Sequence, residues 1–574
     1  MFESVHQLAA EIVRAPSLGL RVVPELLHAR RVGGSLLSAV YGHARTQPDA
    51  DALVSATERV SYRQLQARIE TRREWLRSQG VRRGDTVLIV GSSGVEYVCL
   101  LLACSARGAT AALSSDDWSP AFLERAIELT APKLVLANTA AASKLQSIRL
   151  TASAARAAEA VDYAGPAYLE QLATIEVQSE PVLPAASRDL ACIFTSGTTG
   201  PSKVHRVGEA RALFVATLFA HLVHRLRATD RLYCCLPLHH ASGLLLGLGT
   251  CLVAGVPLVL RERFSASAFF DDLRAYDASV ALYIGELGRA LLAVPASSRD
   301  REHRLRLLVG NGLSEVVWNE LRARFGVPEI VEFYAATEFP GAIVNLTGKV
   351  GSVGHVPLAR LRGYALIRVT DTGDVVRDRR GFAVRPRPDE PGELVLRSRA
   401  AVAESAPTAR YVRELFRRGD AYVRSGDLFR RDRAGYYWFV DRLGDTFRFK
   451  GELVATRDVE AVFEREGVHG VSIVGVRVPG LDGKAGLAIA EQSLDRSAFV
   501  RALPALPNFA RPRFLRLTER FELGQSFKLR KRQFSEQGVD PSRVEDALHW
   551  VTGEALEPLT PALWQRIVSG SLRL

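Results

Sequence analysis

Short apolar runs alternate with amphipathic stretches through the first part of the chain. Residues 86–90 and 134–136 predict strands, whereas residues 95–106 and 122–129 have the spacing of helices. Strands that alternate with helices are typical of an α/β domain with a mainly parallel sheet. Residues 191–194 predict another short buried strand, and residues 155–180, Ala-rich and without a clear period, predict a variable connection. At the N-terminus, residues 5–13 predict a short amphipathic helix that packs on the domain or touches a membrane surface.

The pattern changes near residues 441–445, where the long core gives way to a smaller region of strands and helices. Residues 471–476 predict a strand there, and helix-like segments continue beyond Arg532 to the end of the chain. We therefore predict a large α/β N-terminal domain, residues 1–440, a hinge at residues 441–444, and a small, mobile α+β C-terminal domain, residues 445–574. Gly444 is the predicted pivot, because glycine can absorb a large φ/ψ change.

One long uncharged stretch raises the question of a membrane span. Residues 232–260 contain no Asp, Glu, Lys or Arg, a length that could cross a bilayer. The stretch also holds two prolines, two histidines and several glycines, which favour a strand, a loop, a buried helix and a second strand inside a core. Gly247 and Gly249 lack the third glycine of a dinucleotide loop, so core packing is the better interpretation for them as well.

Composition narrows the class of protein and its surroundings. The chain has 574 residues, 47% of them hydrophobic and 24% charged, and a formal net charge of +12. Its 75 basic residues are eight lysines and 67 scattered arginines without a basic block, which favours attraction of anionic substrates over nucleic-acid binding. The six cysteines form no Cys-x-x-Cys motif, so neither a zinc site nor a disulfide framework is predicted. No continuous apolar stretch precedes Pro16, which argues against a secretory signal. We expect a cytoplasmic protein, with peripheral membrane contact left open.

The strand at residues 191–194 leads into a loop suited to an oligophosphate. Glycines let the backbone N–H groups approach phosphate, hydroxyls add donors, and a lysine adds a point charge. The spacing is not that of a Walker loop, and a flexible turn is the alternative interpretation. The residues that we expect to bind nucleotide here are Thr195, Ser196, Gly197, Thr198, Thr199, Gly200 and Lys203.

This loop resembles the Thr-Ser-Gly-Thr-Thr-Gly-x-Pro-Lys motif of the adenylate-forming superfamily, to which acyl-CoA synthetases belong. Here Pro201-Ser202 replaces the usual pair before the lysine. Further motifs follow in family order from about residue 35 to about residue 550. The resemblance implies ATP, Mg²⁺ and CoA as cofactor and co-substrates, with Thr195 and Glu338 as oxygen ligands of the metal.

The resemblance extends to other nucleotide-binding positions. Tyr334-Ala335-Ala336-Thr337-Glu338 is similar to the family's Tyr-Gly-x-Thr-Glu, with Ala335 in place of glycine. It implies that Tyr334 lies against adenine and Thr337 near the α-phosphate. The family arrangement also implies a ribose contact for Asp427 and Arg442, and a catalytic role for Lys528 in a motif where Phe527 replaces glycine. For Thr337-Glu338 the alternative interpretation is a helix start, and for Gly426-Asp427 it is a turn. For Asp441-Arg442 it is an exposed ion pair, and for the segment around Lys528 it is a solvated basic segment. Three of the scarce lysines lie in motif-like segments, which favours functional roles for them: Lys203, Lys450 and Lys528.

On the acyl side, the segments around Tyr283 and Gly310 resemble the branch of fatty acid transport proteins and very-long-chain acyl-CoA synthetases. The resemblance implies that His240, Tyr283, Gly285 and Gly310 line the substrate site, although each could also be an ordinary turn. An aspartate that would bind a substrate amine is missing near His240, which favours a carboxylic acid without an α-amino group.

We therefore expect an ATP-dependent ligase that converts a long- or very-long-chain fatty acid and CoA to acyl-CoA, AMP and pyrophosphate through an acyl-adenylate. Three alternatives stay open: a steroid or bile-acid side chain as substrate, a carrier protein as acyl acceptor, and a non-catalytic lipid-uptake protein. Chain length, oligomeric state, pathway and the role of the C-terminal tail are not predicted from the sequence.

Overall fold

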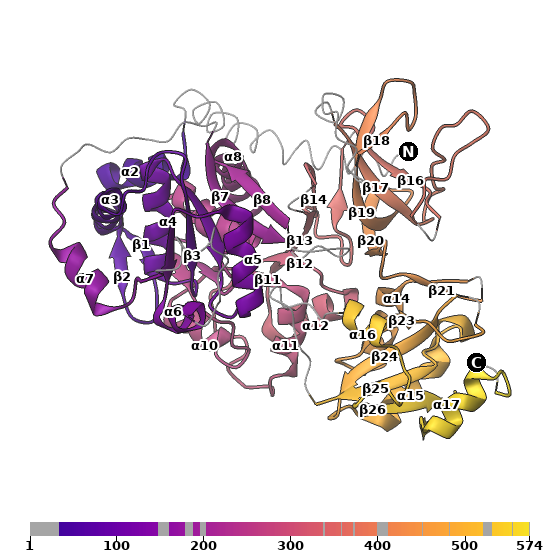
Figure 1. Ribbon diagram of the computed structural model, residues 1–574. Helices are drawn as coiled ribbons and strands as arrows, with labels where there is room; N and C mark the ends of the chain where they lie inside the picture. The colour runs from indigo at the N-terminus through magenta and orange to yellow at the C-terminus, as the bar shows by residue number, and fades with distance from the viewer. Residues whose placement is uncertain are drawn as a thin grey trace.

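The computed structural model shows a large N-terminal domain and a smaller C-terminal domain with its own sheet (Figure 1). It describes residues 34–146, 160–177, 188–195, 203–336, 339–357, 359–370, 373–398, 411–450, 452–481, 483–519, 531–553 and 555–572. The predicted α/β class is confirmed. The domain limits at residues 440 and 445 and the hinge between them stay predictions.

A six-stranded sheet near the start of the chain carries the phosphate-loop strand. Its central strands run parallel, and only β8 at one edge is antiparallel. The three strands predicted at residues 86–90, 134–136 and 191–194 are confirmed as β3, β5 and β7. In spatial order the strands are β6 (Val161–Asp162), β5 (Leu134–Ala137), β3 (Thr86–Val90), β4 (Thr110–Ser114), β7 (Asp189–Thr195) and β8 (Lys203–Gly208).

An eight-stranded sheet forms the second layer of the large domain. Its inner strands are parallel and nearly all apolar, as expected for a sheet covered on both faces. The two edge strands, β14 and β2, are antiparallel. In spatial order the strands are β14 (Ala342–Val344), β13 (Glu329–Ala335), β12 (Leu307–Asn311), β11 (Val280–Ile284), β9 (Leu232–Cys234), β10 (Leu258–Leu260), β1 (Asp51–Val54) and β2 (Arg59–Ser61).

Several helices of the large domain begin at a capping serine or end at a glycine. Ser35 and Ser61 form capping boxes at the starts of α2 and α3, and Gly108 ends α4 at a left-handed φ of 74°. The α4 helix is buried almost all round, within a core that joins both parallel sheets. The helices are α2 (Leu36–Thr46), α3 (Tyr62–Ser78), α4 (Val95–Arg107), α5 (Pro120–Thr130), α6 (Thr139–Gln146), α7 (Pro166–Ala173), α8 (Glu209–Leu218), η2 (Phe219–Val223), η3 (Ser242–Gly249), α9 (Thr250–Ala254), α10 (Phe269–Ala275), α11 (Gly285–Ala293) and α12 (Glu315–Phe325).

A third, antiparallel sheet follows, and the C-terminal domain comes after it. In Figure 1 the third sheet lies above the C-terminal domain and beside the large parallel sheets. Its strands are β15 (Gly354–His355), β20 (Tyr436–Arg442), β19 (Ala421–Arg431), β17 (Gly392–Arg397), β16 (Tyr364–Ile367) and β18 (Tyr411–Arg413), the last paired with β19.

The C-terminal domain combines a five-stranded sheet, a hairpin and short helices around a separate hydrophobic core. The strand predicted at residues 471–476 is confirmed as β23. The elements are β21 (Phe447–Phe449), β22 (Glu452–Val454), α14 (Thr456–Arg465), β23 (Ser472–Val476), β24 (Ala485–Glu491), α15 (Arg496–Ala502), η4 (Leu503–Ala505), η5 (Asn508–Ala510), β25 (Phe514–Thr518), α16 (Lys531–Gln537), β26 (Ala547–Val551), β27 (Leu556–Pro558) and α17 (Pro561–Val568).

The uncharged stretch from residue 232 to residue 260 folds inside the core as predicted. It forms β9, a loop, the π-helical segment η3 that continues into α9, and β10. Gly247 and Gly249 are buried in η3, where a Cβ would meet Cys234 and Ala216, so core packing explains both. Within the described residues no helix combines the length and the apolar character needed to cross a bilayer.

Two interpretations of the chain were incomplete. Residues 160–177, expected to be part of a variable connection, contain β6 and the helix α7, whose Tyr168 and Leu172 are buried. The tail beyond Arg532, expected to be helical, also forms β26 and β27, which extend the C-terminal sheet next to β25. These strands are stabilised by pairing with distant residues, which local periodicity does not show. The helix predicted at residues 5–13 lies outside the described residues.

Candidate active site

The carboxyl ends of β11, β12 and β13 meet at one edge of the eight-stranded sheet. The register pairs Tyr283 with Gly310 and Gly310 with Glu332 across the three strands. In open α/β sheets, ligands bind at the carboxyl ends of parallel strands. Three residues singled out from the sequence therefore lie at this edge: Tyr283, Gly310 and, at the end of β13, Tyr334.

The glycines at this edge are required by the protein's own backbone. A Cβ on Gly310 would lie 2.1 Å from the carbonyl oxygen of Tyr283, and one on Gly285 would lie 2.2 Å from that of Gly312. Such contacts leave no room for a side chain. Close packing of the chain thus explains Gly285 and Gly310 without a ligand, and their role in lining an acyl site stays a prediction.

Glu332 joins the three strand ends and was missed in the sequence. Its buried carboxylate accepts hydrogen bonds from the hydroxyl of Tyr283 at 2.6 Å and from the backbone N–H groups of Leu313 at 2.9 Å and Gly312 at 3.0 Å. Burial raises the pKa of Glu332 to about 7, although the three donors oppose that shift. The Tyr283 hydroxyl is therefore occupied by Glu332, and Glu332 fixes the loop that follows β12.

Tyr334 contacts the third sheet, and this contact brings two predicted nucleotide residues together. Its hydroxyl donates to Oδ2 of Asp427 at 2.6 Å, and its ring packs edge-on against Phe429, 4.8 Å between centroids. Burial and the adjacent Asp427 carboxylate raise the pKa of Tyr334, so the hydroxyl remains a donor at neutral pH. Asp427 in turn lies opposite Arg442 in the β19–β20 register. Three residues predicted to bind nucleotide thus lie together although they are far apart in sequence.

An ion pair with a buried carboxylate holds the irregular part of β19 before Asp427 in place. Glu393 pairs with Arg424 and also accepts from the backbone N–H of Gly426 at 3.0 Å. Gly426 has a φ of 78°, in the left-handed region that favours glycine. The Gly-Asp motif is therefore an irregularity within β19 that Glu393 holds, and Asp427 is half-buried there.

The phosphate loop connects β7 and β8. Thr195 and Lys203 are Cα partners at the end of this antiparallel pair, so the two ends of the loop lie side by side. This geometry agrees with a loop delivered by a buried strand. Thr337, Glu338 and Lys528 lie outside the described residues. The same holds for the other predicted residues of the loop, which are Ser196, Gly197, Thr198, Thr199 and Gly200.

His240 lies in the loop between β9 and η3, next to the buried His239, with 4.4 Å between the ring centroids. Burial lowers the pKa of His239 well below its usual value, so it is neutral and belongs to the core. His240 is only half-buried. Its role in lining the substrate site stays a prediction.

Beyond Arg442, the chain turns at Gly444 into the C-terminal domain. A Cβ on Gly444 would meet no heavy atom within 4 Å. Just before the turn, the buried Asp441 accepts from the backbone N–H of Thr456 at 2.7 Å and from its hydroxyl at 2.9 Å. Burial raises the pKa of Asp441 to about 6, an effect that the nearby Lys531 ammonium reduces. The predicted pivot is thus free of side-chain contacts, with an anchored residue three positions before it.

Lys531 is a second residue whose place the sequence interpretation missed. It follows the Lys528 motif, whose alternative interpretation is a solvated basic segment, but its ammonium donates to Glu460 at 2.7 Å and to the Thr456 hydroxyl at 2.9 Å. The scarcity of lysine was an available signal, because it applies to Lys531 as much as to the three lysines noted above. Lys531 therefore anchors the start of α16 to α14.

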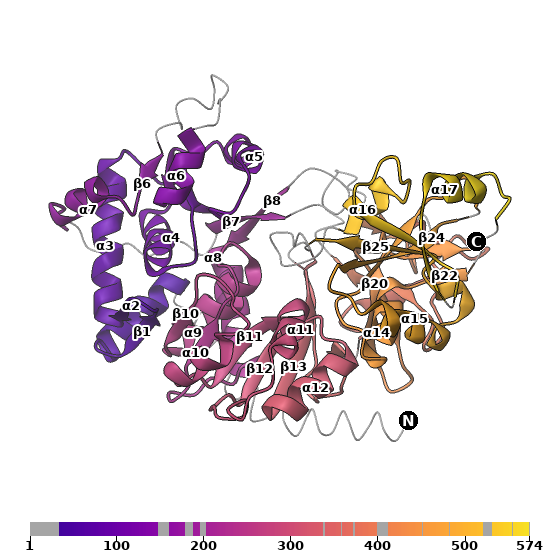
Figure 2. The ribbon, with the colours of Figure 1, turned by 90° about the horizontal axis from the view of Figure 1, so that it is seen from below.

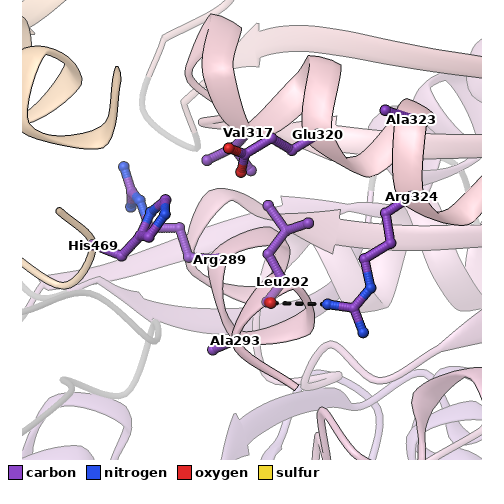
Figure 3. Close-up of a pocket in the computed structure, with 8 residues that line it drawn as sticks. All are labelled: Arg289, Leu292, Ala293, Val317, Glu320, Ala323, Arg324 and His469. Carbon is purple, nitrogen blue, oxygen red and sulfur yellow. Dashed lines mark hydrogen bonds between the residues drawn. The ribbon is translucent and has the colours of Figure 1, made fainter. Parts of the chain in front are cut away.

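A cavity of about 560 Å³ lies apart from these residues, between α11, α12 and His469 of the C-terminal domain (Figure 3). Arg324 crosses one side and donates to the carbonyl oxygen of Leu292 at 2.9 Å. Its charge is met by Asp300 at 2.7 Å. The lining contains none of the residues predicted from the sequence to bind nucleotide or acid.

Comparisons with known proteins identify a family and several relatives of the chain. Residues 40–404 match the family of AMP-binding enzymes. The long-chain fatty acid transport protein 1 of Mus musculus is 35% identical over 97% of this chain and 91% of its own length. The long-chain fatty acid transport protein 6 of Mus musculus is 32% identical over 94% of this chain and 91% of its own length.

Solved structures share the fold at lower identity. An anthranilate CoA ligase in complex with anthranoyl-AMP superposes with a TM-score of 0.71 at 19% identity, covering 86% of this chain and 95% of that chain. ATP-bound MatB from Rhodopseudomonas palustris gives a TM-score of 0.70 at 20% identity, covering 88% of this chain and 98% of that chain. The α/β fold of this chain is therefore the fold of these solved structures.

The chain belongs to the AMP-binding enzyme family. Its similarity to the fatty acid transport proteins extends over both domains, which agrees with the resemblance noted in the sequence.

Proposed function

We propose that the protein is an ATP-dependent ligase that converts a long- or very-long-chain fatty acid and CoA to acyl-CoA, AMP and pyrophosphate. The observation that carries the proposal is the meeting of Tyr334, Asp427 and Arg442 at the end of β13. An aromatic ring beside a carboxylate suits a nucleoside, because the ring can stack on the base while the carboxylate accepts from ribose hydroxyls. The family membership of the chain supports the same assignment.

In the first proposed step, the fatty acid carboxylate attacks the α-phosphorus of ATP, and pyrophosphate leaves. The loop between Thr195 and Lys203 holds the phosphates, Thr337 lies near the α-phosphate, and Lys528 stabilises the charge that gathers between the carboxylate and the α-phosphate. In the second step the thiol of CoA loses its proton and attacks the acyl-adenylate carbonyl, and AMP leaves. The small domain turns about Gly444 between the two steps.

The metal ligands belong to the same proposal. Thr195 and Glu338 offer the hydroxyl and carboxylate oxygens that Mg²⁺ prefers. Within the described parts of the chain, no cluster of three His, Cys, Asp or Glu side chains forms an alternative metal site. Bound Mg²⁺ would supply positive charge beside the oligophosphate, while the residues named above position the substrates.

The substrate is expected to enter an apolar site. His240 is half-buried, and the loop that contains it, residues 235–241, has no acidic residue that could pair with a substrate amine. Transfer of one methylene from water to an apolar site contributes up to about 0.8 kcal/mol, so several carbons change selectivity by orders of magnitude. We therefore expect kcat/KM to rise steeply from acetate through C8 to C16 and C22 acids.

The measurement is acid-dependent AMP formation by purified protein with CoA, each acid kept below its micelle threshold and a steroid side-chain acid included. A maximum at acetate or at the steroid acid would reject the long-chain assignment and leave adenylation intact. Absence of AMP with every acid would favour the lipid-uptake alternative. The relatives reported above are named as fatty acid transport proteins. AMP formation that needs an acyl-carrier protein instead of CoA would identify the third alternative.

Replacing Tyr334 by phenylalanine tests the nucleotide assignment. The change removes the hydroxyl that donates to Asp427 and leaves the ring on Phe429. A hydrogen bond to a charged group contributes about 1.5–3 kcal/mol, so we expect the KM for ATP to rise about tenfold or more, with kcat changed less than about twofold. Steady-state kinetics at saturating acid measure both constants.

The matched control is Tyr436→Phe on β20, the strand that pairs with β19. The hydroxyl of Tyr436 donates to the hydroxyl of Thr347 at 3.1 Å and not to Asp427. That variant should keep the wild-type KM for ATP. An unchanged KM in Tyr334→Phe, or an equal rise in the control, would contradict the assignment of Tyr334 and Asp427 to the nucleoside.

A further inference from the structure

The C-terminal domain contacts the large domain through one face of α14. In both Figures 1 and 2, α14 lies toward α12, whereas the hairpin of β21 and β22 lies on the side away from the large domain. The contacts come from two residues on the same face of the helix, Arg457 near the start of α14 and Glu464 near its end. They reach the loop at residues 311–314 and the helix α11.

Glu464 forms the charged part of this contact. Its carboxylate accepts from Nε of Arg289 in α11 at 2.6 Å and from the hydroxyl of Ser314. The Glu464 side chain is 6% exposed and that of Arg289 26% exposed, so the ion pair is partly shielded from solvent. Ser314 is also the N-cap of α12, where its side chain accepts from the backbone N–H of Val317. Glu464 therefore binds the residue that fixes the start of α12.

Arg457 contacts the same loop from the same side. Its Nη2 donates to the carbonyl oxygen of Gly312 at 2.9 Å, and its guanidinium lies over the ring of Phe439. On the other side of the loop, Glu332 accepts from the N–H groups of Gly312 and Leu313. The loop at residues 311–314 is thus held by Glu332 from within the large domain and by α14 from the C-terminal domain.

The orientation held by these contacts presents α16 to the large domain. Figure 2 shows α16 on the side of the C-terminal domain that faces the large domain, opposite β22. In the sequence, α16 begins three residues after Lys528, and Lys531 ties its first turn to Glu460 of α14. The contacts of α14 therefore stabilise the arrangement in which α16 faces the large domain.

We propose that Glu464 and Arg457 are positioning residues for acyl-adenylate formation. With their partners Arg289, Ser314 and the Gly312 carbonyl they form a latch, which we call the α14 latch. It holds the loop at residues 311–314 against Glu332 while the first half-reaction occurs, and it must open before the C-terminal domain can turn for the thiol step. This inference rests on the proposed function, because it assigns the latch to one of that reaction's two steps.

The test measures the two half-reactions separately in Glu464→Gln. The amide keeps the shape of the side chain but loses the charge that pairs with Arg289. We expect the rate of acid-dependent pyrophosphate–ATP exchange to fall about tenfold. Loss of a hydrogen bond to a charged group changes an equilibrium constant by about tenfold or more. Conversion of supplied acyl-adenylate and CoA to thioester should stay unchanged or become faster. Arg457→Gln should shift the two rates in the same direction.

Glu466→Gln is the matched control, because Glu466 is an exposed carboxylate two residues further along the same helix end. It should leave both rates unchanged. Exchanging the charges of the pair, Arg289→Glu with Glu464→Arg, should recover most of the lost exchange. An unchanged ratio of the two half-reactions in Glu464→Gln, or an equal fall in both, would overturn the latch.

Hydrogen exchange provides a readout that needs no substrate. In the free protein, Glu464→Gln should speed amide exchange at residues 311–314 and in α14, relative to wild type and Glu466→Gln. Failure of the wild-type protein to adenylate any acid would reject the proposed function, whereas unchanged protection at residues 311–314 would reject the latch. The two failures are therefore distinguishable.

Discussion

Replacing Lys528 by alanine is expected to lower acyl-adenylate formation by about 100-fold or more. Loss of one preorganised charge at a site of developing negative charge costs about 3–4 kcal/mol. The thiol step on supplied acyl-adenylate should continue, because we propose that the C-terminal domain, which carries Lys528, turns away from the site before that step. Pyrophosphate–ATP exchange and thioester formation measure the two steps in one preparation.

The exposed lysine Lys133 provides the control, since Lys133→Ala removes an ammonium from the large domain's surface. That variant should keep both rates. If Lys528→Ala slowed both half-reactions equally, the residue would have a role in folding or the motif assignment would be wrong. The prediction rests on the motif and on the scarcity of lysine, because Lys528 lies outside the described residues.

Gly444→Pro is expected to block the thiol step while adenylation continues. Proline fixes φ and restricts the preceding Leu443, so the turn between β20 and β21 could no longer change shape. We expect thioester formation from supplied acyl-adenylate to fall at least about tenfold, with pyrophosphate–ATP exchange within about twofold of wild type. Rapid-quench measurement of each half-reaction gives the two values.

Gly444→Ala separates rotation from simple crowding. A Cβ at this position has no heavy atom within 4 Å, so alanine fits the observed arrangement. The alanine variant should therefore retain both steps, and a loss equal to that of the proline variant would indicate a packing effect. Normal acyl-CoA formation by Gly444→Pro would show that the domain does not turn at this residue.

Sequence reasoning succeeded where local pattern decides structure. The strands at residues 86–90 and 191–194 were predictable because continuous apolar runs favour buried parallel strands. The uncharged stretch at residues 232–260 was assigned to the core because prolines and glycines interrupt it. The family motifs also indicated Tyr334, Asp427 and Arg442, which the fold places together.

Long-range pairing explains what the sequence could not show. Glu332 acquires its role only when β11, β12 and β13 align, which brings Tyr283, Gly312 and Leu313 to one carboxylate. Glu464 needs α14 of one domain to lie against Arg289 of the other. Neither charge has a distinctive neighbour in sequence, so no spacing rule indicates it.

The most direct test of the account is acid-dependent exchange of labelled pyrophosphate into ATP by the purified protein, with palmitate and without CoA. We expect exchange that requires the acid, followed on addition of CoA by one AMP and one palmitoyl-CoA for each ATP consumed. Palmitate bound without exchange, or ADP and phosphate as the products, would contradict adenylation as the function of this site.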